Sequence, residues 1–129
     1  MQKFAVVAAV VSSLLPAVKA QSPGEIFQKH WKLSGEFTID VAQTMPADKY
    51  TFKPNDAEMD FGRVMVHIGL ANNNAMAIIS GQPNPTPQAI LATYKDPKGT
   101  FHKDDVIQFL TDSFAFGNKV WNIHRMRSN

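Results

Sequence analysis

The chain has 129 residues, of which 44% are hydrophobic, and it contains no cysteine. This length and composition fit a single domain with enough apolar residues for a core. The absence of cysteine excludes disulfide bonds, thiolate metal ligands and a cysteine nucleophile.

The first 20 residues have the pattern of a secretory signal peptide. Lys3 precedes a continuous apolar run over residues 4–11, and Val18 and Ala20 stand at the −3 and −1 positions of a signal-peptidase site. This order predicts cleavage after residue 20 and a periplasmic or secreted protein. The alternative is an uncleaved membrane anchor. The apolar run is shorter than the ~20 residues of a spanning helix, so we favour cleavage and expect no stable membrane span afterwards.

Removal of the signal peptide changes the charge of the protein. The whole chain has 13 basic and 11 acidic residues, and its first 20 residues hold two basic residues, Lys3 and Lys19, and no acid. The remaining domain, residues 21–129, therefore has 11 basic and 11 acidic residues and no net charge. A protein without excess positive charge lacks the electrostatic footprint of nucleic-acid binding, so we expect no nucleic-acid partner.

Apolar periodicity predicts an all-α protein with three long helices. Ser22-Pro23-Gly24-Glu25 forms a capping-box pattern that opens a helix to about Gln43. Asp60 and Gly81 are the expected caps of a second helix over residues 61–80, and a third begins near Lys103. The apolar positions assigned to the helix faces that form the core include Phe37, Val64, Ile68, Ile78, Ile79, Phe109, Leu110 and Phe114.

Residues 82–99 form a long connection between the second and third long helices. It contains Pro83, Pro85, Pro87 and Pro97, and residues 88–94 favour a short helix within it. A connection of this length is typical of a crossover between two parallel helices rather than a tight hairpin.

Three segments resemble the DinB-like (damage-inducible) four-helix-bundle family. They are MPADKYTFKP at residues 45–54, MDFGRVMVHI at residues 59–68 and KDDVI at residues 103–107. The similarity extends over roughly residues 25–120. It implies an up-down-down-up helix bundle, and it identifies residues 21–129 as a DinB-like domain. The chain shows three long helices of this bundle, so we expect the fourth to be missing or truncated.

The resemblance also implies a divalent metal, such as zinc, nickel or manganese, held by one histidine of the second helix and two of the last. Some relatives act as metal-dependent thiol transferases or hydrolases, so a small-molecule thiol is a candidate substrate, and many relatives are homodimers. By position, His67 is the metal ligand of the second helix. The family's His-x-x-x-His pair has no counterpart in this chain. The sequence therefore leaves open whether the protein is an enzyme.

Four polar residues are the candidates for a site. Arg63, His67 and Asn74 recur at helical spacing and are expected to line one strip facing the bundle, where Arg63 and Asn74 would support the metal or face a substrate. A hydrogen-bonded core histidine is the alternative for His67, and a solvent-facing position is the alternative for Asn74. His124 continues the core register of the third helix and is a second candidate ligand. Its alternative is a plain C-terminal residue.

The sequence leaves two hypotheses for the function. The first is an exported metal-binding protein related to the thiol transferases or hydrolases, in which the metal would act as a Lewis acid. The alternative is a non-catalytic remnant or helix-groove interaction module, because three amphipathic helices without a fourth leave apolar surface uncovered.

Overall fold

The computed structural model describes residues 20–127. Over this range the chain is all-helical, and it forms no strand. The signal-peptide prediction falls almost wholly on residues outside the described range. The elements in chain order are α2 (Pro23–Thr44), the 3₁₀ turn η1 (Ala47–Lys49), α3 (Phe61–Ser80), α4 (Gln88–Lys95) and α5 (Lys103–Arg127).

The expectation of a missing fourth helix needs a correction. The described residues contain four α-helices, three of them long and one short. The short helix α4 lies inside the connection between α3 and α5, where residues 88–94 favoured a helix. The all-α class is confirmed.

The predicted caps of α2 and α3 are confirmed. Ser22 Oγ accepts from the Glu25 N–H, and the Glu25 carboxylate accepts from the Ser22 N–H at 2.8 Å. The Ser22 N–H and the Ser22 hydroxyl, which donates to the same carboxylate at 3.1 Å, hold the pKa of the Glu25 carboxyl below its usual value. At α3, Asp60 accepts from the Arg63 N–H, and Gly81 ends the helix with a φ of 67°, which glycine adopts without strain.

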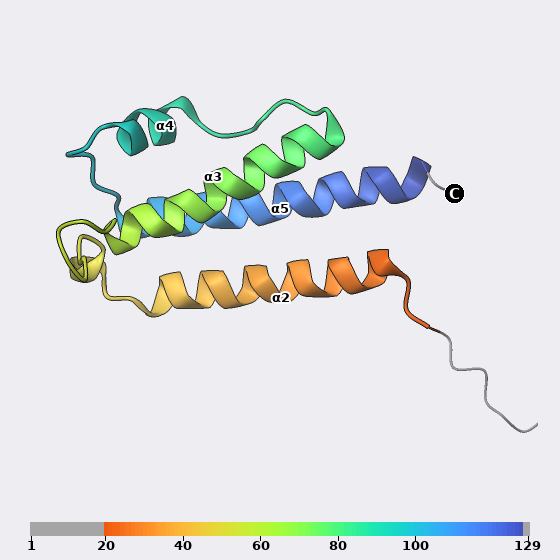
Figure 1. The fold of residues 1–129 in the computed structure, drawn as a ribbon, viewed down its shortest axis with the longest axis horizontal. Helices are drawn as coiled ribbons and strands as arrows, with labels where there is room; N and C mark the ends of the chain where they lie inside the picture. Colours follow the sequence, from red (N-terminus) through yellow and green to blue (C-terminus); the bar gives the residue numbers. More distant parts are fainter. Residues whose placement is uncertain (1–19, 128–129) are drawn as a thin grey trace, which may run out of the picture.

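α5 is the central one of the three long helices, and α2 and α3 pack against it. Figure 1 shows α3 and α5 running in the same direction, α2 running in the opposite direction, and the chain between α3 and α5 returning along the length of α3. α5 packs against both α2 and α3, whereas α2 and α3 make few contacts with each other. The parallel course of α3 and α5 is the geometry expected for a connection as long as residues 82–99.

The core lies where α5 meets its neighbours. Two glycines bring helices close together: Gly69 of α3 lies against the ring of Phe109, and Gly35 of α2 lies against Phe114. Burying one aliphatic or aromatic side chain contributes about 1.5–3 kcal/mol, so the α5 face carries much of the stability. The buried core residues are Ala42, Tyr50, Met65, Val66, Phe101, Val106, Phe109, Leu110 and Phe114.

Tyr50 joins the turn after α2 to the core. Its hydroxyl donates to the Ala42 carbonyl at 2.6 Å, and its ring meets Phe61 edge-on. Burial raises the pKa of the Tyr50 phenol, and the Asp104 carboxylate adds to this effect. Tyr50 therefore caps the end of α2 and places the start of α3.

Several residues assigned to core-forming faces are exposed instead. Phe37 of α2 is 72% exposed, and Ile78 and Ile79 of α3 are 74% and 72% exposed. Periodicity identifies the apolar side of a helix, but it does not show whether a neighbouring element covers all of that side. No helix in the described range is long and apolar enough to cross a membrane.

Candidate functional site

Arg63 lies near the start of α3 and holds the segment that follows α4. Its guanidinium donates to the carbonyls of Tyr94, Asp96 and Gly99. It also lies over the Tyr94 ring, 5.5 Å from the ring centroid, and 3.9 Å from the Asp60 carboxylate. Because this guanidinium is committed to backbone carbonyls, Arg63 acts as an anchor of the crossover connection.

His67 lies one turn further along α3 and is exposed. Its Nδ1 is 2.8 Å from the Tyr94 hydroxyl, and the two rings stack with centroids 6.1 Å apart. The Tyr94 hydroxyl is also 3.9 Å from the Met59 sulfur. If Nδ1–H donates to the tyrosine oxygen, Nε2 keeps its lone pair, which is the form that binds a metal.

The three consecutive asparagines of α3 have different surroundings. Asn74 is exposed, whereas Asn73 is buried and donates to Thr86 Oγ1 at 2.9 Å. Asn72 approaches Ser113 of α5 at 3.5 Å. Asn73 therefore attaches the crossover connection to α3, a role that the sequence pattern did not single out.

The strip formed by Arg63, His67 and Asn74 does not face α5. Arg63 and His67 contact Tyr94 of α4, while α3 turns the buried Met65 and Gly69 toward the core. The three residues share one side of the helix, as their spacing predicts, but that side is the outer one, next to α4.

His124 lies far from His67 in a single chain. Gly69 packs against Phe109, and α3 and α5 run in parallel, so His67 is level with about residue 107. At 1.5 Å per residue, His124 is then about 25 Å further along α5. His124 is exposed, and its ring lies 6.4 Å from that of Trp121. The two histidines do not share a site within one chain.

The described part of the chain does not form a complete metal site. It contains no group of three or more His, Cys, Asp or Glu side chains placed to hold one ion. His67 is a single donor, and a stable zinc site usually takes three or four protein ligands. The residues present therefore do not fit the metal implied by the resemblance unless other ligands join His67.

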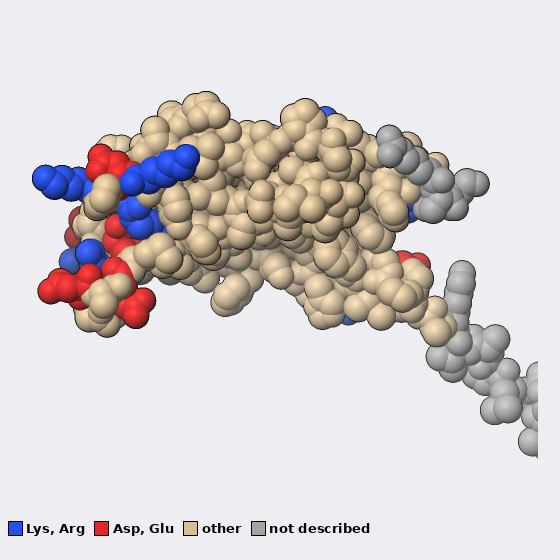
Figure 2. All heavy atoms as spheres, turned by 45° about the horizontal axis from the view of Figure 1, so that its top comes forward, with Lys and Arg blue, Asp and Glu red and all other residues tan. Residues whose placement is uncertain are grey.

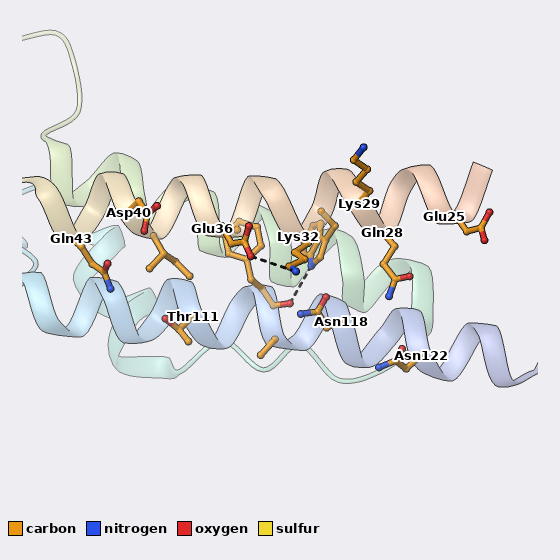
Figure 3. Close-up of a pocket in the computed structure, with 15 residues that line it drawn as sticks. Glu25, Gln28, Lys29, Lys32, Glu36, Asp40, Gln43, Thr111, Asn118 and Asn122 are labelled. Carbon is orange, nitrogen blue, oxygen red and sulfur yellow. Dashed lines mark hydrogen bonds and ion pairs between the residues drawn. The ribbon is translucent and has the colours of Figure 1, made fainter. Parts of the chain in front are cut away.

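A groove of about 1180 Å³ follows the contact between α2 and α5. Trp31 and Phe114 lie among its lining residues and are joined by a hydrogen bond from Trp31 Nε1 to the Phe114 carbonyl at 3.2 Å. Lys32 and Glu36 form an ion pair at 3.8 Å along it (Figure 3). None of the four candidate residues of the sequence lines this groove. Its polar lining residues are Glu25, Gln28, Lys29, Lys32, Glu36, Asp40, Gln43, Thr111, Asn118 and Asn122.

Charged side chains are distributed very unevenly over the face that contains α3 and α4. Figure 2 shows most of them at the end of the molecule where η1 and the starts of α3 and α5 lie, and an almost uncharged surface over the rest of this view. The sequence explains the pattern, because residues 64–94 contain no Asp, Glu, Lys or Arg.

Comparisons with family models, with curated proteins and with solved structures found no match to this chain.

Proposed function

We propose that this protein is an exported, DinB-like helical interaction module that uses the uncovered apolar faces of α2 and α3 to bind another helix. The DinB-like assignment rests on the three sequence segments and on the all-helical fold. In this proposal the long helices are part of an up-down-down-up bundle, and the bound helix packs on the uncovered faces of α2 and α3.

The exposure of six large apolar side chains carries the proposal. Side chains of this size are costly to leave in water, at about 25 cal/mol per Å² of apolar surface. Exposed apolar patches of this kind mark interaction sites on soluble proteins. A partner that fits is an amphipathic helix with an uncharged apolar face. The six side chains are Ile26, Leu33 and Phe37 on α2, and Val64, Ile78 and Ile79 on α3. Phe27 of α2 is also exposed but is left out because it packs against Trp31 and Trp121.

A synthetic amphipathic helix tests this function. We expect a labelled peptide of about 20 residues, with Leu and Ala on one face and Gln on the other, to bind and raise its fluorescence anisotropy. Phe37→Lys and Ile78→Lys should each weaken binding at least about tenfold, since a buried Lys is costly. Lys32→Gln, in the polar lining of the groove between α2 and α5, is the matched control. No binding, or equal binding by all variants, would sink the proposal.

The second candidate function is the metal-dependent one, as a relative of thiol transferases or hydrolases. The observation that favours it is the contact between His67 Nδ1 and the Tyr94 hydroxyl, which orients the ring. Zinc, nickel or manganese retained after dialysis in near-stoichiometric amount, and lost in His67→Ala, would support it. A negligible metal content, or the same metal content in the wild type and in His67→Ala, would rule out this second function.

A further inference from the structure

We infer that Met59 is a modification site, at which hydrogen peroxide converts the thioether to a sulfoxide with the Tyr94 hydroxyl as the proton donor. Met59 directly precedes Asp60, the N-cap of α3, and its sulfur lies 3.9 Å from the hydroxyl of Tyr94 on α4. The inference is independent of the helix-binding proposal, because it concerns the contact between α3 and α4 and not the exposed apolar faces.

A chain of hydrogen bonds ends on the Met59 sulfur. The Tyr94 hydroxyl donates to Met59 Sδ, and the same oxygen lies 2.8 Å from His67 Nδ1. When the tyrosine proton is directed at the sulfur, His67 supplies the second bond through its Nδ1–H. Both bonds then run in one direction, and an O–H group faces the sulfur lone pairs.

Tyr94 is held in place through its backbone and through its ring. Arg63 donates to the Tyr94 carbonyl and lies over the ring, 5.5 Å from the centroid. The imidazole of His67 stacks on the same ring, with the centroids 6.1 Å apart. A cation over the ring polarises the phenol and strengthens its O–H as a donor. The hydroxyl is therefore both positioned and activated toward the sulfur.

Met59 is open to a small polar oxidant. It is 40% exposed, and it lines a cavity of about 390 Å³ together with residues that include Asp60, Arg63 and Lys98. Most of the lining residues carry charged or hydroxyl side chains, which bind a molecule that both donates and accepts hydrogen bonds, as hydrogen peroxide does. Met65, in contrast, is buried in the core.

The reaction converts the thioether and hydrogen peroxide to the sulfoxide and water. The sulfur lone pair forms the S–O bond as the O–O bond breaks, so the sulfur is oxidised and the peroxide is reduced. The leaving oxygen takes the Tyr94 proton and departs as water, and the hydroxyl now bound to sulfur returns its own proton to the Tyr94 oxygen. The 3.9 Å gap keeps the Tyr94 hydroxyl within hydrogen-bond reach of an oxygen bonded to that sulfur.

The sulfoxide fits the same surroundings. Its oxygen is a stronger acceptor than a thioether sulfur, so it keeps Tyr94 as its donor while Tyr94 still accepts from His67. Oxidation at Met59 is therefore accommodated by the fold, whereas a polar sulfoxide among the core residues would disrupt their packing.

Time courses with dilute hydrogen peroxide test the site. The purified chain is digested at each time point, and mass spectrometry measures the fraction of each methionine that has gained an oxygen atom. Met59 should be oxidised before Met126, although Met126 is 71% exposed and exposure alone predicts the reverse order. In urea, which removes the folded contacts, the two rates should become equal.

Tyr94→Phe removes the proton donor and keeps the ring. It should slow the oxidation of Met59 at least about fivefold, because a positioned proton donor accelerates such a step. The rate at Met126 should not change. Lys95→Ala, next to Tyr94 on the exposed side of α4, is the matched control and should leave both rates unchanged. Circular dichroism checks that each variant remains helical.

Oxidation of Met126 ahead of Met59 in the wild type would overturn the inference, and this comparison needs no variant. A Met59 rate that Tyr94→Phe leaves unchanged or raises would also overturn it, because the hydroxyl would then play no part.

Discussion

The indole ring of Trp31 lies so close to Gly117 that a Cβ at position 117 would overlap the ring atoms Cζ2 and Cε2. The same ring stacks on Phe27, packs at a tilt against Phe114 and donates its N–H to the Phe114 carbonyl. Trp31 is therefore fixed on several sides, and α2 approaches α5 this closely only because residue 117 has no side chain.

Gly117→Ala should therefore destabilise the protein. Alanine would favour the helix by about 1 kcal/mol, but the clash with a ring that has little room to move should outweigh this gain. We expect a net loss of about 1–3 kcal/mol in the free energy of unfolding, measured by urea denaturation. Lys119→Ala, on the exposed side of α5, should change stability by less than about 0.5 kcal/mol. A Gly117→Ala variant as stable as the wild type would contradict this packing.

Arg63→Ala should loosen the segment after α4. Arg63 satisfies the carbonyls of Tyr94, Asp96 and Gly99, and hydrogen bonds to charged groups contribute about 1.5–3 kcal/mol. We expect a loss in this range, with faster amide hydrogen exchange in residues 94–99. Lys95→Ala removes a neighbouring exposed charge and should leave exchange unchanged. Equal exchange in both variants would argue against the anchoring role.

Stability should fall at alkaline pH because of Tyr50. Burial raises the pKa of its phenol above the ordinary value of 10.0, so the stability due to the neutral phenol is present below that value. It is lost as the pH rises through the higher folded-state pKa, because ionisation favours the unfolded chain. Tyr50→Phe should be less stable by about 1 kcal/mol at neutral pH, since it loses the bond to Ala42.

The difference in the free energy of unfolding between the wild type and Tyr50→Phe should then become smaller above about pH 10. Urea denaturation at several pH values measures it, and the ultraviolet absorbance of tyrosinate follows ionisation. Parallel pH profiles for the two proteins would show that Tyr50 is not responsible.

The exported form should begin at Gln21. Cleavage after Ala20 follows from the signal-peptide pattern, and intact mass together with N-terminal sequencing of the exported protein measures it. Ala20→Asp should block processing, because the −1 position takes only small residues. A full-length chain retained in the membrane fraction would instead support the uncleaved anchor.

The helices were predictable because their signals are local. Ser22, Asp60 and Gly81 mark helix ends through hydrogen bonds to residues a few positions away, and the structure bears out all three. Coverage of a helix face depends on distant elements, which is why Phe37 and Ile78 were assigned to the core although both are exposed. The local sequence pattern shows which side of a helix is apolar, but it does not show whether another element covers that side.

The candidate site was harder to predict for a similar reason. The spacing of Arg63, His67 and Asn74 places them on one side of α3, but the direction of that side depends on where α4 packs. Tyr94 contacts both Arg63 and His67, yet it follows them in the sequence by 31 and 27 residues. It also belongs to none of the motifs that the sequence shows. A tyrosine following a proline-rich connection is a weak signal before the fold is known.

The parallel course of α3 and α5 also determines how the chain tolerates change. Their register comes from the packing of Gly69 against Phe109. Near its start the connection is held to α3 by Asn73 with Thr86, and near its end by Arg63. The entropy of closing a loop grows slowly, by about 0.6 kcal/mol for each doubling of its length. Extra glycine or serine residues between Gln82 and Pro85 would therefore lengthen the path without moving either helix, which makes this stretch the natural place to graft a tag or a second domain.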